Sequence, residues 1–307
     1  MTTTIDRIDR IPNAITTTPD ATARAIWTMI AEPGDHGIGA LIAAEGAEQA
    51  LRHVLYGDDD SVDGIDIRLI RARTQARVSA ETVEAAFQAA VRVAAALLTP
   101  EHPHWPAGLN DLGHGAPYAL WVRGDTEALS ATGSIALVGA RAATGYGEHV
   151  TKEMASELVE RGRSIVSGAA YGIDGMAHRA AIASGGRTVA YLAGGIDRPY
   201  PSGHADLIRR ITDTGAVAAE VACGAVPTKW RFLSRNRLIA AGSRATVVIE
   251  AGSRSGSLNT ASHAIDVGRP VGAVPGPITS AASAGCHRLI REFGATLVTT
   301  AHEADEL

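Results

Sequence analysis

Residues 135–174 have the sequence IALVGARAATGYGEHVTKEMASELVERGRSIVSGAAYGID, and this stretch decides the fold. It opens with an apolar run at Ile135–Gly139, continues through an amphipathic segment at Glu148–Gly162, and returns to an apolar run at Ser164–Ser167. A strand, a helix and a second strand in this order are typical of parallel strands joined by a crossover helix. The stretch therefore predicts one unit of a parallel sheet.

The same alternation continues on both sides of this unit. Further strands are predicted at Ala119–Val122, Thr188–Leu192, Ala216–Val221, Ala245–Ile249, Pro270–Val274 and Ala295–Thr299. Most of them are separated by one segment of helical length, such as Leu258–Val267. We therefore expect an α/β fold with a doubly wound, mainly parallel sheet, whose ligands bind beyond the carboxyl ends of the strands.

The first third of the chain has helical spacing of its apolar residues. Helices are predicted at Ala23–Ala31, Ile38–Leu55 and Ala80–Leu98. A connector containing proline and glycine follows at Thr99–Pro117. We expect a small helical N-terminal domain at residues 1–99 and the sheet domain at residues 100–307.

Composition limits the class of protein. Hydrophobic residues make up 46% and charged residues 20% of the 307 residues, which excludes disordered and fibrous proteins. The two cysteines are too few for a disulfide scaffold. The first 14 residues lack the apolar core of a signal peptide, and the sequence has no run of about 18 apolar residues that could span a membrane. We expect a cytoplasmic protein without membrane contact.

The net charge of −5 conceals an uneven distribution. Residues 1–132 contain 10 Arg, no Lys and 18 acidic residues, whereas residues 133–307 contain 18 basic and 15 acidic residues. A bound anion is therefore expected in the second part.

The loops after the predicted strands carry groups that attract anions. Arg141 offers a planar guanidinium within the glycine-containing loop Val138–Gly147, in which Thr144 could cap the next helix. Arg198 and Tyr200 follow Gly194-Gly195 in the third loop. Each loop could instead be a structural turn with a solvated arginine. The dinucleotide fingerprint G-x-G-x-x-G is absent, so a nicotinamide dehydrogenase is disfavoured.

Two later segments complete the pattern. Arg235-Asn236-Arg237 lies at the head of a predicted helix, and Ser255-Gly256-Ser257 leads into the next helix, where free amides favour an anion. The triplet could alternatively be a solvated basic surface. Asp174 in the second loop could cap the helix that carries His178, and Glu250 could orient an arginine.

These segments, in this order, resemble the DNA-processing protein A (DprA/Smf) family. The family patterns V-G-S/A-R…T-x-Y-G, S-G-x-A-x-G-I-D, F-x-x-R-N-R-x-I-A and E-A-x-x-x-S-G-S-L-x-T-A are similar to Val138–Gly147, Ser167–Asp174, Phe232–Ala240 and Glu250–Ala261. Two more, G-x-G-x-D-x-x-Y-P and R-x-V-x-A-V-P-G, are similar to Ala193–Pro201 and Arg269–Gly276. The resemblance covers about the last two thirds of the chain.

Family membership would imply an extended Rossmann-like domain that binds single-stranded DNA, forms a homodimer and helps to load RecA recombinase during natural transformation. Its nucleic-acid-binding residues would be Arg141, Gly194, Gly195, Arg198, Tyr200, Arg235, Asn236, Arg237, Ser255, Gly256 and Ser257. Tyr171 departs from the family, which often has a basic residue there, and could supply a second stacking face. No cofactor or metal is implied.

An enzyme is the main alternative. Lonely Guy phosphoribohydrolases use a similar strand-to-helix loop that ends in a catalytic carboxylate, but Thr260 stands at that position here. The sequence also lacks an ATP-binding P-loop, a G-x-S-x-G elbow and a cluster of metal ligands. Catalysis through Glu250 or Asp174, or a nucleotide-sensing module of the same fold, remains open at this point. We expect a protein that is not an enzyme.

Overall fold

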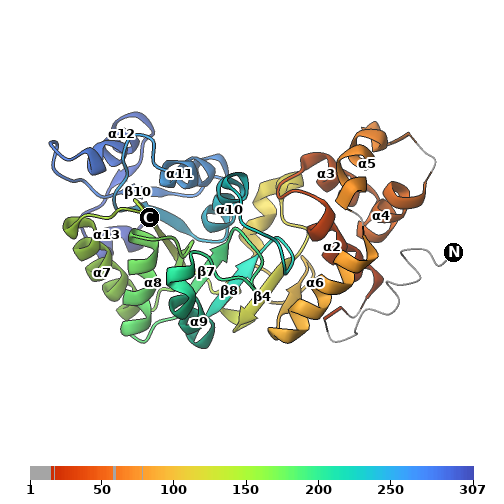
Figure 1. Ribbon diagram of the computed structural model, residues 1–307. Coiled ribbons are helices and arrows are strands. Elements are labelled where there is room, and N and C mark those ends of the chain that lie inside the picture. The colour runs from red at the N-terminus through yellow and green to blue at the C-terminus, as the bar shows by residue number, and fades with distance from the viewer. Residues whose placement is uncertain (1–14, 17, 58–59, 78) are drawn as a thin grey trace.

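A nine-stranded sheet forms the centre of the molecule in this computed structural model, which describes residues 15–16, 18–57, 60–77 and 79–307 (Figure 1). The strand order is β11-β10-β9-β5-β6-β7-β8-β4-β3. The strands are β3 (Ala96–Leu98), β4 (Leu120–Gly124), β5 (Ile135–Val138), β6 (Ile165–Ser167), β7 (Thr188–Leu192), β8 (Ala216–Ala219), β9 (Ala245–Val248), β10 (Val271–Ala273) and β11 (Thr296–Leu297). All adjacent pairs from β11 to β8 are parallel, and β4 and β3 add an antiparallel edge.

The helices lie on both faces of the sheet, as Figure 1 shows. One face is covered by α7 (Gly145–Glu160), α8 (Ile173–Ala183), α9 (Ala205–Thr214) and α13 (Ala301–Asp305), and the other by α10 (Lys229–Ala241), α11 (Ser257–Asp266) and α12 (Ala284–Glu292). The chain runs from β5 to β8 in one direction, then returns to build β9 to β11 on the other side of β5. The predicted doubly wound, mainly parallel sheet is therefore confirmed, and its direction reverses between β5 and β9.

Alternate side chains along a strand pack against the helices on opposite faces of the sheet. In β5, Ile135 and Leu137 join the core with α7 and α8, whereas Ala136 and Val138 join the core with α10 and α11. Every residue of the alanine-rich strand β8 is buried. Small side chains there let the helices approach the sheet closely.

The N-terminal helices pack against the antiparallel edge of the sheet. They are α2 (Pro19–Ile30), α3 (His36–Glu45), α4 (Ala47–Tyr56), α5 (Ile67–Thr74) and α6 (Ala80–Arg92), with a small hairpin of β1 (Ser61–Val62) and β2 (Ile65–Asp66). The ring of Phe87 in α6 meets Trp121 of β4 edge-on at 5.7 Å, within one core that includes residues of α2, α3, α4 and α9. The helical region and the sheet thus share a continuous core. Their division into domains at residue 99 stays a prediction.

Two predicted helices were wrong in their extent. The segment Ile38–Leu55 forms two helices, because Gly46 adopts a φ of 82° and ends α3. The segment Ala80–Leu98 is helical only to Arg92, since Ala94 has a φ of 52°, and β3 then joins the sheet beside β4. The edge strand therefore comes from residues that were expected to be helical.

No helix in the described part of the chain is long and apolar enough to cross a membrane.

Candidate functional site

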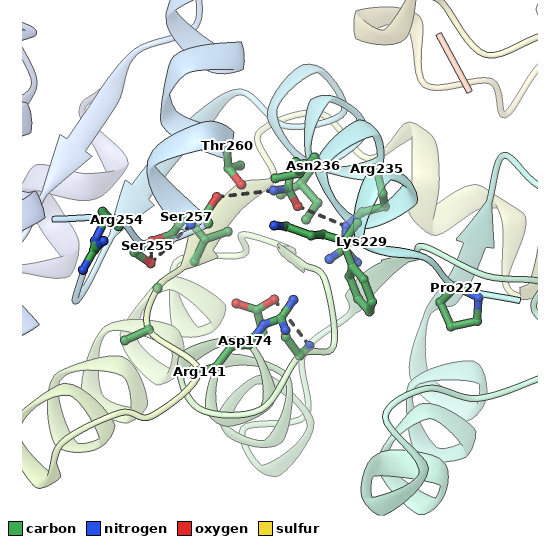
Figure 2. A pocket seen from close by; sticks show the side chains of 18 of the residues that line it. Arg141, Asp174, Pro227, Lys229, Arg235, Asn236, Arg254, Ser255, Ser257 and Thr260 are labelled. Carbon is green, nitrogen blue, oxygen red and sulfur yellow. Dashed lines mark hydrogen bonds between the residues drawn. The ribbon is translucent and has the colours of Figure 1, made fainter. Parts of the chain in front are cut away.

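A cavity of about 740 Å³ opens at the carboxyl ends of β5 and β9, where the direction of the sheet reverses. Its walls are the loop after β5, the first half of α10 and the loop between β9 and α11 (Figure 2). This is the position at which doubly wound sheets bind their ligands, because two neighbouring loops diverge there. The cavity is therefore the candidate site.

Three exposed cationic side chains line this cavity. Arg141 follows β5, Lys229 is the first residue of α10, and Arg254 lies in the loop before α11. Figure 2 shows Lys229 extending from α10 into the space above Arg141 and Asp174. None of the three cations forms an ion pair in the described part of the chain, although the charge of Arg141 acts on the nearby Asp174 and lowers its pKa.

The half-buried ring of Phe232 lies among these charges. The guanidinium of Arg141 is 4.9 Å from its centroid, and that of Arg235 is 5.8 Å away. The ring of Tyr200, half exposed, lies 5.6 Å from the Phe232 ring. Both aromatic residues line the cavity, so the site combines cations with apolar rings.

Beneath them, Arg235 and Asp174 form a buried floor. Arg235 donates to the carbonyls of Gly168, at 2.8 Å, and Tyr191, and burial lowers the pKa of Arg235 to about 10, so it stays charged at neutral pH. Asp174 Oδ2 accepts from the backbone amides of Gly168 and Ala170 at 3.2 and 3.4 Å. Burial raises the pKa of Asp174, which the Arg235 charge opposes. Asp174 thus fixes its own loop rather than capping α8.

The start of α11 forms the opposite wall. Ser255, Gly256 and Ser257 line the cavity, and the hydroxyl oxygens of the two serines are 2.8 Å apart. Asn236 of α10 donates its amide to the carbonyl of Gly256 at 3.3 Å and to the side-chain oxygen of Asn259 at 3.1 Å. The N-terminal end of a ten-residue helix thus faces the cavity with its partial positive charge.

Glu250, directly after β9, holds the loop that carries Arg141. Its carboxylate accepts from the Thr144 amide at 2.9 Å and from the Thr144 hydroxyl at 2.6 Å. Thr144 is the N-cap of α7 and also accepts from Gly147, as the sequence predicted for a cap. Glu250 therefore orients a backbone loop, and the expectation that it orients an arginine is not met by these contacts.

The structure does not bring every predicted residue into the cavity. Arg141, Tyr200, Arg235, Asn236, Ser255, Gly256 and Ser257 line it, whereas Gly194, Gly195, Arg198 and Arg237 do not. Gly194 and Gly195 pack against Pro227 and the carbonyl of Ala222. Arg198 is exposed outside the cavity.

Arg237 lies on another side of α10. Its Nη2 donates to both carboxylate oxygens of Glu220, at 2.5 and 2.7 Å, and both side chains are buried. The backbone of Gly34, from the helical region, lies directly over this guanidinium. Its place is in the contact between α10 and the N-terminal region.

Among the lining residues that sequence reasoning missed are two cations and an aromatic ring, namely Lys229, Phe232 and Arg254. Helical spacing could have found the first two, because Lys229, Phe232 and Asn236 recur at steps of three and four on one face of α10. Arg254 sits in the glycine- and serine-rich loop that was already singled out. Within the described residues, no group of three or more His, Cys, Asp or Glu side chains could hold a metal ion.

Known proteins with similar sequences identify the family of this chain. The model of the DNA recombination-mediator protein A family matches residues 96–306. A Mycobacterium tuberculosis protein that bears the DprA name is 43% identical over 300 residues, which cover 94% of this chain and 75% of the relative.

Two solved structures are also similar. That of DprA from Streptococcus pneumoniae has a TM-score of 0.76 at 29% identity and covers 93% of this chain and 96% of that one. A structure of DNA processing protein A from Helicobacter pylori, described for its single-stranded DNA binding mode, has a TM-score of 0.62 at 28% identity and covers 68% of this chain and 94% of that one. With its extended Rossmann-like sheet and the motifs around its cavity, the chain belongs to the DNA recombination-mediator protein A family.

Proposed function

We propose that the protein binds single-stranded DNA in the cavity at the β5–β9 reversal, without sequence preference and without chemical change to the strand. The observation that carries this proposal is that the exposed cations Arg141, Lys229 and Arg254 line the same cavity as the ring of Phe232. Cations that follow a backbone, together with aromatic faces for bases, are the combination that single-strand binders use. The described binding mode of the Helicobacter pylori relative supports it.

Competition between strand states tests this proposal. Fluorescence anisotropy would follow a labelled oligonucleotide displaced by the same sequence as a single strand or as a duplex. We expect the single strand to compete more strongly, because only unstacked bases can reach a ring inside the cavity. Arg141→Ala should weaken binding. Arg161→Ala should not, because Arg161 follows the C-terminal end of α7, near the amino ends of the strands and away from the cavity. Equal competition by duplex would contradict the proposal.

An enzyme acting on a nucleotide is the second candidate, and Asp174 is the observation that favours it. A buried carboxyl with a raised pKa in a cavity is a candidate general acid. Its two bonds from backbone amides, however, aim it at the loop after β6. Incubation with AMP or NAD followed by chromatography separates the two functions. We expect no released base, and base release that Asp174→Asn abolishes would establish the enzyme instead.

Loading of RecA recombinase onto the bound strand, in the cytoplasm and during natural transformation, is the finer role that we propose from family membership. RecA-catalysed ATP hydrolysis on strands coated with a single-strand-binding protein measures loading. We expect addition of this protein to shorten the lag before hydrolysis. An unchanged lag with wild-type protein that binds DNA would limit the role to binding alone.

A homodimer is part of the same proposal. In the amphipathic segment Gly285–Phe293, Leu289 is buried in the core and is unsuitable for a test. The exposed apolar side chains nearest to it are Ile265, 40% exposed on α11, and Phe293, 50% exposed after α12. We expect Phe293→Glu to lower the mass measured by sedimentation, and an unchanged mass would remove this surface from consideration.

A further inference from the structure

Tyr171 lies at the rim of the cavity but outside it. It follows Ala170, which lines the cavity, and its side chain is 48% exposed. Tyr200 is another exposed tyrosine of this rim and, unlike Tyr171, lines the cavity. It begins the turn that leads to Gly203. Gly203 in turn lies against the ring of Tyr171, so the two tyrosines mark the two ends of a short turn. Tyr171 therefore lies against the turn that leads away from Tyr200 and the cavity.

The ring of Tyr171 is held in place. It meets the ring of His204 edge-on, with centroids 4.7 Å apart, and His204 Nδ1 lies 3.0 Å from the carbonyl oxygen of Ala169. A Cβ added at Gly203 would come within 2.6 Å of the Tyr171 hydroxyl oxygen, so the phenol occupies the space that a side chain there would need. A ring fixed in this way loses little conformational entropy when a base stacks on it.

An unpaired cation lies beside the same histidine. A Cβ added at Gly175 would be 2.5 Å from His204 Cε1 and 2.9 Å from Arg179 Nη1, so the guanidinium of Arg179 borders the ring that supports Tyr171. Arg179 is exposed, and it forms no ion pair within the described residues. The ring of Tyr171, the ring of His204 that holds it and the guanidinium of Arg179 therefore lie together on one patch of the surface.

We infer that Tyr171 and Arg179 form a second nucleotide-binding position, in which Tyr171 stacks on a base that has left the cavity and Arg179 neutralises the phosphate next to it. This inference rests on the proposed binding of single-stranded DNA and extends its path from the loop after β5 to the face of α8. Stacking on a tyrosine needs no particular base, because every base has a π-face. The position therefore lengthens the bound strand without adding sequence preference.

Strand length separates this position from the cavity. Oligothymidines of about 4 and about 16 nucleotides span the range of site sizes for single-strand binders. For the long strand, we expect Tyr171→Ala to weaken binding by about 5-fold to 150-fold, the range that loss of one stacked base produces. The short strand should be unaffected, and Tyr171→Phe should bind both strands like the wild type.

Two further variants test the support and the cation. Gly203→Ala should displace the Tyr171 ring and reproduce the effect of Tyr171→Ala while the tyrosine is still present. Arg179→Ala should make the salt dependence for the long strand shallower by about 0.7 in log–log slope. Tyr56→Ala, a tyrosine 45% exposed in the N-terminal region, and Arg161→Ala are the matched controls and should change neither value.

The outcomes separate the two proposals. If the wild type binds both strands and Tyr171→Ala binds the long strand unchanged, the second position is refuted and the cavity stands. If Tyr171→Ala loses the same affinity for the short and the long strand, Tyr171 belongs to the binding site in the cavity, and a separate second position is refuted. If the wild type binds neither strand, the proposed function fails and takes the second position with it.

Discussion

Replacement of Lys229 by alanine tests the role of the cavity most directly, because the side chain is exposed and pairs with no carboxylate among the described residues. It is one of three such cations, with Arg141 and Arg254. Each phosphate neutralised on a single strand contributes about −0.7 to the slope of log affinity against log salt concentration, so three contacts predict a slope of about −2.1 for a strand of about 4 nucleotides, which is too short to reach Arg179 as well. Lys229→Ala should reduce the slope to about −1.4.

These slopes translate into affinities that anisotropy titrations can resolve. Between about 50 and about 200 mM salt, the wild type should lose affinity roughly 18-fold and Lys229→Ala roughly 7-fold. Arg161→Ala, which removes a cation near the amino ends of the strands, should keep the wild-type slope. A slope for Lys229→Ala equal to that of the wild type would refute a phosphate contact at Lys229. A wild-type slope near zero would refute binding of the strand by these cations altogether.

Three further predictions concern stability. Glu220→Ala leaves the buried charge of Arg237 without its partner and should lower the free energy of unfolding by about 3–5 kcal/mol in urea. Burial lowers the pKa of His178 from 6.5 to about 3 in the folded state. Between these two pH values the imidazole is protonated in the unfolded chain but not in the folded one. The free energy of unfolding should therefore fall as the pH falls from 6.5 to about 3, by up to about 1.4 kcal/mol per pH unit. Gly147→Ala places a Cβ 2.1 Å from Glu250 Oε2 and should cost about 1–3 kcal/mol.

Each of these three has a matched control. Asp206→Ala breaks an exposed pair with Arg209, which solvent screens, and should lower the free energy of unfolding far less than Glu220→Ala does. His178→Asn should flatten the pH dependence relative to the wild type. Gly145→Ala, where an added Cβ meets no atom within 4 Å, should leave stability nearly unchanged. If a control changes the free energy of unfolding, or its pH dependence, as much as its test variant does, the physical reason given for that variant is wrong.

The sheet was predictable because its strands are short apolar runs separated by helices of ordinary length. The strand Thr188–Leu192 was predicted to the residue, and the cap at Thr144 followed from its place before an amphipathic segment. The end of α6 was not predictable, because the apolar spacing continues past Arg92 and only the positive φ of Ala94 breaks it. An alanine gives no signal of that conformation, whereas Gly46, which ended α3, could have been suspected.

The position of the cavity followed from the rule that ligands bind at the carboxyl ends of strands, and the loops after β5 and β9 do form it. Which side chains face inward required more than the order of motifs. Arg198 follows a strand as Arg141 does, yet it lies outside the cavity. The loop after β7 leaves Arg198 in solvent, although Tyr200, two residues later in the same loop, lines the cavity.

The triplet Arg235-Asn236-Arg237 shows how a motif on a helix divides between two tasks. Successive residues of an α-helix are rotated by about 100°, so Arg235 and Arg237 point to nearly opposite sides of α10. Arg235 supports the floor of the cavity, Asn236 reaches the start of α11, and Arg237 pairs with Glu220 beneath Gly34 of the helical region. Arg235 and Asn236 of this triplet therefore line the cavity, whereas Arg237 joins α10 to Glu220 and to the N-terminal helices.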